Sequence, residues 1–146
     1  MEIHTASEGI TLARKLENDS AKFYEEIAQK YTRDAETFLS FARDNKKNIT
    51  QIERAYYGVI TDAIEGCYAF NINPDNYTFK TAIPEGASYT DTLNQAAEME
   101  EKIIKFYTDA AEQSKSLMAD VPRNFTIVAR KRNNRIPQLQ SLASKA

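Results

Sequence analysis

The spacing of the apolar residues constrains the fold of this chain more than any other feature. In four segments, apolar side chains recur every three or four residues, the period that places them on one face of an α-helix. The segments begin near Thr5, after Asp34, behind Thr90 or Asp91 as N-cap, and at Asp120. Representative members of the four stripes are Leu16, Phe23, Phe41, Ile52, Ile103, Tyr107, Phe125 and Leu139. The pattern predicts an all-α fold.

Local signals indicate where these helices begin and end. Thr5-x-x-Glu8 matches a capping box, in which side chains satisfy the first free N–H groups of a helix. The second helix is expected to weaken near Gly66. Pro122 fits the first turn of the fourth helix. Pro137 lies inside that helical pattern and is expected to kink the helix or to end its regular part.

The connections arrange the helices in two pairs. Short links near Thr32 and near Met118 make the helices on either side antiparallel neighbours. Between the pairs, a stretch of about 20 residues rich in Pro and Asn is too long for a simple turn. We therefore expect residues from about Asn71 to Tyr89 to cross the length of an antiparallel four-helix bundle without forming strands. The prediction is one domain over residues 1–146.

Composition excludes several functional classes. The chain has 19 Lys and Arg against 21 Asp and Glu, which gives no general attraction to nucleic acid or acidic membranes. The basic run from Arg130 to Arg135 would spread around a helix, so we interpret it as a solvated face. A single cysteine, Cys67, excludes an internal disulfide and a CxxC zinc site. No apolar run is long enough to span a bilayer, and the first residues do not match a secretory signal. We expect a soluble, cytoplasmic protein.

The two helix pairs resemble each other. The string LENDSAKFY, which begins at Leu16, aligns with MEEKIIKFY, which begins at Met99. In each pair a Glu precedes a Phe-Tyr dipeptide by six residues. A duplicated helix hairpin explains this similarity.

The strings LENDSAKFYEEIA and AAEMEEKIIKFYTDAA resemble the first and third helices of rubrerythrin-like proteins in the ferritin-like family. The resemblance implies a ferritin-like bundle and a homodimer. In that family these two helices each supply one Glu, and the other two helices each supply a Glu-x-x-His pair, to a di-iron centre. By this match Glu17 and Glu100 occupy ligand positions.

The other four ligand positions carry different residues. Asn45 and Asn48 replace one Glu-x-x-His pair, and Arg132 and Arg135 replace the other. The single histidine, His4, lies in the N-terminal tail. Two iron ions need carboxylates to balance their charge and imidazoles to complete their shells. The expectation is therefore no metal, no cofactor and no catalytic residue at these positions.

The replaced positions predict an ion-pair network. Arg132 falls on the inward stripe, where its guanidinium could donate hydrogen bonds to Glu17, Glu100 or both. Asn45 and Asn48 would complete the network as neutral donors and acceptors. The alternative is that Arg132 or Arg135 lies at the edge of the stripe in contact with water.

Three functions remain open from the sequence. The leading hypothesis is a non-catalytic structural or interaction module. The alternative is a di-iron oxidoreductase acting on peroxide, or an iron store, in which Glu98 or Glu53 would assist Glu17 and Glu100. A third hypothesis is a binder of small molecules near the two Asn residues.

Five tyrosines are interpreted as core rings whose hydroxyl groups reach a partner. They are Tyr24, Tyr31, Tyr56, Tyr57 and Tyr107.

Overall fold

The computed structural model describes residues 2–57, 68–116 and 120–145. Over these ranges α-helices dominate, which confirms the predicted all-α class. They are α1 (Ala6–Lys30), α2 (Ala35–Tyr57), α4 (Tyr89–Gln113), α5 (Asp120–Asn133) and α6 (Arg135–Lys145). The short 3-10 helix η1 (Thr32–Asp34) follows α1. Two more 3-10 helices flank α4: η2 (Pro74–Tyr77) precedes it, and η3 (Ser114–Ser116) follows it. Among the described residues, no helix is both long and apolar enough to cross a membrane.

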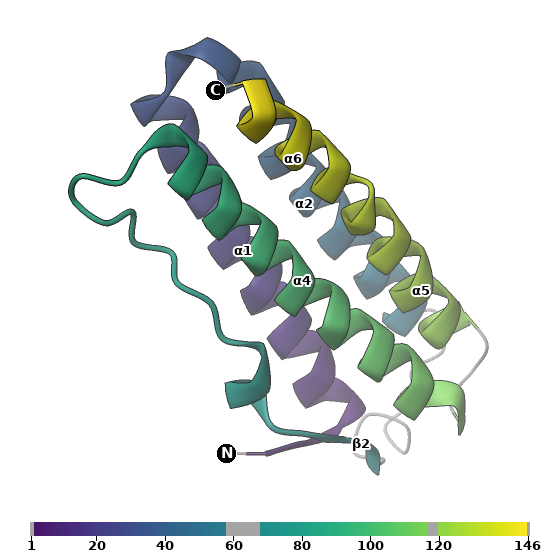
Figure 1. Cartoon of the computed structure of the whole chain (residues 1–146). Helices are drawn as coiled ribbons and strands as arrows, with labels where there is room; N and C mark the ends of the chain where they lie inside the picture. Colours follow the sequence, from purple (N-terminus) through teal and green to yellow (C-terminus); the bar gives the residue numbers. More distant parts are fainter. Residues whose placement is uncertain (1, 58–67, 117–119, 146) are drawn as a thin grey trace.

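The long helices lie side by side in two antiparallel pairs (Figure 1). α1 packs against α2, and α4 packs against both α5 and α6. The two pairs meet where α2 contacts α5 and where α1 contacts α4. The core between the pairs contains fully buried aromatic rings, which include Phe23, Tyr24, Phe38, Phe106, Tyr107 and Phe125. The helical stripes read from the sequence form this core.

A long connection runs beside the helices from the end near the N-terminus to the beginning of α4 (Figure 1). The expected crossing is therefore present, but the expectation that it contains no strand is wrong. Asn71 and Ile72 belong to strand β2 (Tyr68–Ile72), which pairs antiparallel with β1 (Ile3–Thr5). Phe70 and Ile72 are buried while Asn71 is exposed, the alternation of a strand with one buried face.

The small sheet packs closely against the first turns of α1. The ring of Phe70 lies directly over Gly9, and a Cβ atom at Gly9 would overlap this ring. Glycine at this position therefore allows β2 to approach the helix backbone.

Capping boxes begin α1 and α4. Thr5 and Glu8 form the predicted box at α1, with the Thr5 hydroxyl accepting a hydrogen bond from the Glu8 N–H group. The N-cap of α4 is Ser88, so the expectation of Thr90 or Asp91 is wrong. The Asp91 carboxylate instead accepts a hydrogen bond from the Ser88 N–H group, as the third helical residue of the box.

The fourth helical segment is broken, as predicted from Pro137. α5 ends at Asn133, and α6 begins at Arg135. Pro137 has no N–H group to donate to the carbonyl of Asn133, and its ring crowds that carbonyl. The expected weak point of the second helix near Gly66 lies outside the described residues, and so does Cys67.

Candidate functional site

Arg132 lies in the middle of the helices and has no exposed surface. Its Nε donates to Glu17 Oε2 at 2.9 Å, and its Nη1 donates to the two Glu100 oxygens at 2.6 and 2.7 Å. Its Nη2 donates to Ser20 Oγ at 2.9 Å. One guanidinium group from α5 thus joins α1 and α4. The expected contacts from Arg132 to both glutamates are confirmed.

Arg135, the first residue of α6, is the second buried cation of the site. Its Nη1 donates to Glu100 Oε2 at 3.3 Å, and its Nη2 donates to the carbonyl oxygen of Phe41 at 3.1 Å. The guanidinium carbon lies 5.6 Å from the centre of the Tyr24 ring and 4.9 Å from that of Phe41. Only 4% of Arg135 is exposed, so the alternative of a solvated edge position is wrong.

Two tyrosines bind the glutamates crosswise between the helix pairs. The Tyr24 hydroxyl on α1 donates to Glu100 Oε2 on α4 at 2.7 Å. The Tyr107 hydroxyl on α4 donates to Glu17 Oε2 on α1, also at 2.7 Å. Each tyrosine lies seven residues after the glutamate of its own helix and therefore on the same helix face.

Neither tyrosine was assigned to the site from the sequence, although both were expected to be core rings with partnered hydroxyl groups. The signal that identifies them is the Glu-to-Tyr spacing shared by the two repeats. Tyr57 does not fit the expectation of a core ring, because 58% of it is exposed.

Asn45 and Asn48 contribute donors from α2. Asn48 Nδ2 donates to Glu17 Oε1 at 3.1 Å. Asn45 Nδ2 donates to Ser20 Oγ at 2.8 Å and to the main-chain oxygen of Glu17 at 3.0 Å. Both side chains are fully buried, and neither Oδ1 atom has a hydrogen-bond partner among the described residues. The amides join the network as expected, but as donors only.

Charge in this network balances, with two buried carboxylates and two buried guanidinium groups. Burial alone would raise the pKa of Glu100, but Arg132 and Arg135 outweigh it and hold that pKa below its usual value. Burial would lower the pKa of Arg132, but Glu100 and Glu17 outweigh it and raise that pKa well above its usual value. Glu100 and Arg132 are therefore both charged at neutral pH.

The two tyrosines keep their protons. Burial raises the pKa of Tyr24 well above its usual value, and Glu100 raises it further. Burial also raises the pKa of Tyr107 well above its usual value, and Glu17 raises it further. Each hydroxyl group is therefore fixed as a hydrogen-bond donor.

The donor set does not fit a di-iron centre. Every carboxylate oxygen of Glu17 and Glu100 already accepts a hydrogen bond from a protein N–H or O–H group. The guanidinium of Arg132 lies between the two carboxylates, where a metal cation would have to lie to reach both. No group of three or more His, Cys, Asp or Glu side chains suited to a metal occurs in the part of the chain that the structure describes.

The residues suggested as helpers for an iron site lie elsewhere. Glu98 is exposed on α4, and Glu53 forms an ion pair with Arg14 at 3.2 Å near the surface. His4 belongs to β1 and lies 3.6 Å from Glu2. The geometry brings Glu17, Asn45, Asn48, Glu100, Arg132 and Arg135 together but adds none of these three residues.

The network leaves little room for a ligand. A hollow that touches Glu17 does not admit a water molecule; its lining is Ile10, Ala13, Arg14, Glu17, Ile49, Ile52 and Glu53. Neither Asn45 nor Asn48 lines this hollow, so the hypothesis of a small-molecule site beside them stays a prediction. Comparisons with models of protein families, with curated proteins and with solved structures found no match to this chain. The functional conclusion therefore depends on the site itself.

Proposed function

We propose that this protein is a ferritin-like four-helix bundle in which an ion-pair network replaces the di-iron centre, and that it acts as a structural or interaction module without catalysis. The observation that carries the proposal is the position of Arg132. Its guanidinium group lies between Glu17 and Glu100 and donates hydrogen bonds to both. The proposal includes a homodimer, as the family resemblance implies, and a cytoplasmic location, as expected from the sequence.

The arrangement of the helices supports the ferritin-like part of this proposal. Two antiparallel pairs are joined by a connection that runs beside the helices, so α2 and α4 run in the same direction (Figure 1). Glu17 and Glu100 come from α1 and α4, one from each pair. The residues at the Glu-x-x-His positions come from α2 and from the junction of α5 with α6. Such a distribution is typical of the ligand positions in a ferritin-like bundle.

The chemistry of the network supports a role without catalysis. General acid–base catalysis needs a group whose pKa lies near the working pH. Here the pKa of Glu100 is lowered, and those of Tyr24, Tyr107 and Arg132 are raised, so these four groups keep one protonation state near neutral pH. All four are also fully buried and cannot touch a substrate.

Metal analysis tests the proposal directly. The protein is expressed in medium supplemented with iron and manganese, purified without chelator, and analysed by inductively coupled plasma mass spectrometry. We expect far less than one metal ion per chain and no rise of the melting temperature with added Fe(II), because binding to the folded state alone would raise it.

The variant Glu17→Gln/Glu100→Gln serves as the control for metal bound elsewhere. About two irons per chain in the wild type, lost in this variant, would reject the proposal and favour the di-iron oxidoreductase or iron store. A trace of metal that persists in the variant belongs to another part of the protein.

A further inference from the structure

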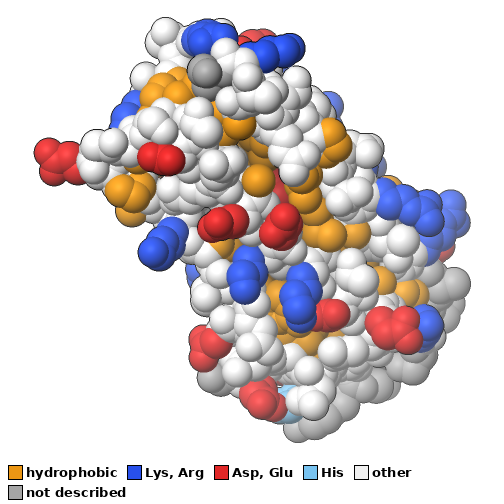
Figure 2. Space-filling view, viewed as in Figure 1, with side chains coloured by type: hydrophobic (Ala, Val, Ile, Leu, Met, Phe, Trp, Pro, Cys, Tyr) orange, Lys and Arg blue, Asp and Glu red, His pale blue; other side chains and the backbone are white. Residues whose placement is uncertain are grey.

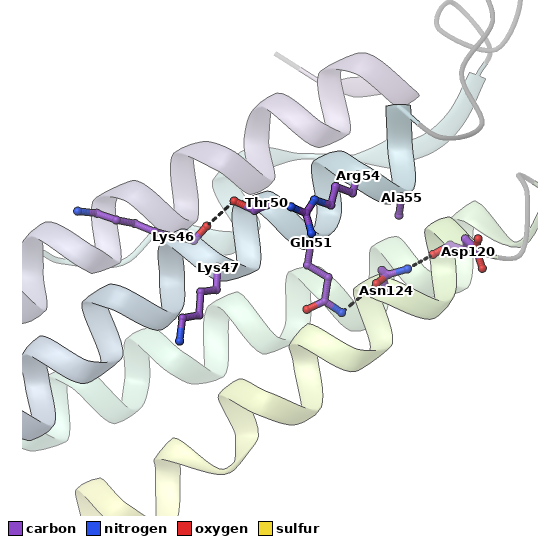
Figure 3. Close-up of a pocket in the computed structure, with 8 residues that line it drawn as sticks. All are labelled: Lys46, Lys47, Thr50, Gln51, Arg54, Ala55, Asp120 and Asn124. Atoms are coloured by element: carbon purple, nitrogen blue, oxygen red, sulfur yellow. Dashed lines mark hydrogen bonds between the residues drawn. The ribbon is translucent and has the colours of Figure 1, made fainter.

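A cleft of about 740 Å³ lies between α2 and the beginning of α5 (Figure 3). Its volume is in the range of small-molecule sites. No residue of the buried network lines it. The lining residues are Lys46, Lys47, Thr50, Gln51, Arg54, Ala55, Asp120 and Asn124.

Hydrogen bonds hold the side chains of Gln51 and Asn124 in this cleft. Gln51 Nε2 donates to Asn124 Oδ1 at 2.9 Å, and Asn124 Nδ2 donates to the main-chain oxygen of Asp120 at 2.6 Å (Figure 3). Lys131 Nζ donates to Gln51 Oε1 at 3.2 Å. Both the nitrogen and the oxygen of the Gln51 amide are thus held by a hydrogen bond, and a fourth cation, Lys131, lies beside the cleft.

Positive charge collects around Gln51. Lys47, Gln51 and Arg54 follow the helical spacing of one face of α2, and the two cations lie on either side of Gln51 (Figure 3). The Lys46 side chain extends away from Asn124 in the same view. Among the described residues, Arg54 forms no ion pair with a carboxylate, whereas Lys47 has only Asp44 at 3.8 Å.

Some cations elsewhere on the molecule are paired with a carboxylate of their own helix. Lys15 and Lys105 each contact an aspartate one turn away, at 2.6 and 3.0 Å. On the face shown in Figure 2, acidic and basic side chains are interspersed. The chain as a whole carries a net charge of -2. The lining of the cleft has three cations, Lys46, Lys47 and Arg54, against one carboxylate, Asp120, so its positive charge does not follow from the composition.

We propose that this cleft binds a small anion with several linked phosphate groups. Lys47 and Arg54 are two helical turns apart, about 10 Å along the axis, a span that suits a short chain of phosphates better than a single one. Arg54 supplies a planar fork for phosphate oxygens, and the lysines supply mobile charges. A nucleic acid would instead need a longer basic surface for many backbone contacts.

Calorimetric titration with sodium tripolyphosphate tests this proposal. The wild type is compared with Lys47→Gln/Arg54→Gln and with the control Lys22→Gln/Lys102→Gln, which removes two exposed cations elsewhere. We expect saturable binding, weakened at least tenfold in the cleft variant and less than twofold in the control. Thermal melts should show that both variants remain folded, because all four side chains are exposed.

Three results would overturn the proposal. The first is no saturable binding of tripolyphosphate by the wild type. The second is equal weakening in the cleft variant and the control, which would indicate attraction to net charge alone. The third is binding of a single-stranded RNA oligonucleotide, lost in the cleft variant, in the absence of tripolyphosphate binding.

Discussion

The hydroxyl group of Tyr24 on α1 donates a hydrogen bond of 2.7 Å to the carboxylate of Glu100 on α4. The reverse contact, from Tyr107 to Glu17, has the same length. Each helix pair therefore supplies the donor for the carboxylate of the other pair. Because these groups are fully buried, the contacts are stronger than they would be in water, and their loss should be measurable.

Replacement of Arg132 by Met should destabilise the protein strongly. The change removes a guanidinium that contacts both Glu17 and Glu100, and it leaves buried Glu100 paired with Arg135 and buried Glu17 without an ion pair among the described residues. Breaking a buried pair in this way costs about 3–5 kcal/mol. Urea unfolding should report a free energy of unfolding that is lower by this amount, and therefore a lower midpoint. A second change, Glu100→Leu, should partly restore stability because it restores the balance of buried charge.

The matched control for this experiment is Arg130→Met, on the same helix but exposed. We expect a change within about 0.5 kcal/mol, as for most surface substitutions. A wild-type urea midpoint in Arg132→Met would contradict the ion-pair network.

Removal of either buried hydroxyl group should also destabilise the protein, by less than the loss of Arg132. Tyr24→Phe and Tyr107→Phe each delete a hydrogen bond to a carboxylate, which contributes about 1.5–3 kcal/mol. Tyr57→Phe, at an exposed position, should leave the free energy of unfolding almost unchanged. Chemical denaturation of the three variants measures the difference. Equal stability of all three would show that the crosswise contacts contribute nothing.

Stability should fall on acidification because of Glu100. Its pKa is lowered in the folded protein from the ordinary value of 4.5, so folding stabilises the ionised form. This contribution is complete above the ordinary pKa and is lost as the pH falls through the lower folded pKa. Between about pH 5 and pH 3, the free energy of unfolding should decline more steeply in the wild type than in Glu100→Leu/Arg132→Met. Parallel declines in urea melts over this range would contradict the assignment.

Gly9→Ala should destabilise the protein although alanine favours helices. Helix propensity alone would add about 1 kcal/mol of stability. The new methyl group, however, would overlap the Phe70 ring, and overpacking of this kind typically costs about 1–3 kcal/mol. In a Phe70→Leu background the same substitution should become neutral or stabilising. Thermal melts of the four proteins distinguish the two effects, and a stabilised Gly9→Ala single variant would show that the ring moves freely.

The sequence was sufficient to predict the helices and the inward position of Arg132, because a period of three to four residues determines which side chains share a face. It did not predict the β1–β2 pairing, because strands of three and five residues carry too little pattern. The two tyrosine contacts were missed for another reason. Whether a tyrosine hydroxyl group reaches a carboxylate on another helix depends on the distance between the two helices, which periodicity does not specify.

The asymmetry of the buried charges bears on how the two similar helix pairs recognise each other. The first pair brings Glu17 and no cation to the network, whereas the second brings Glu100 with Arg132 and Arg135. Two copies of the first pair would bury two carboxylates without a counterion, and two copies of the second would bury four guanidinium groups against two carboxylates. Only the unlike combination is neutral. If the chain arose by duplication of one hairpin, the buried charges now favour packing of the first helix pair against the second over packing of either pair against its own copy.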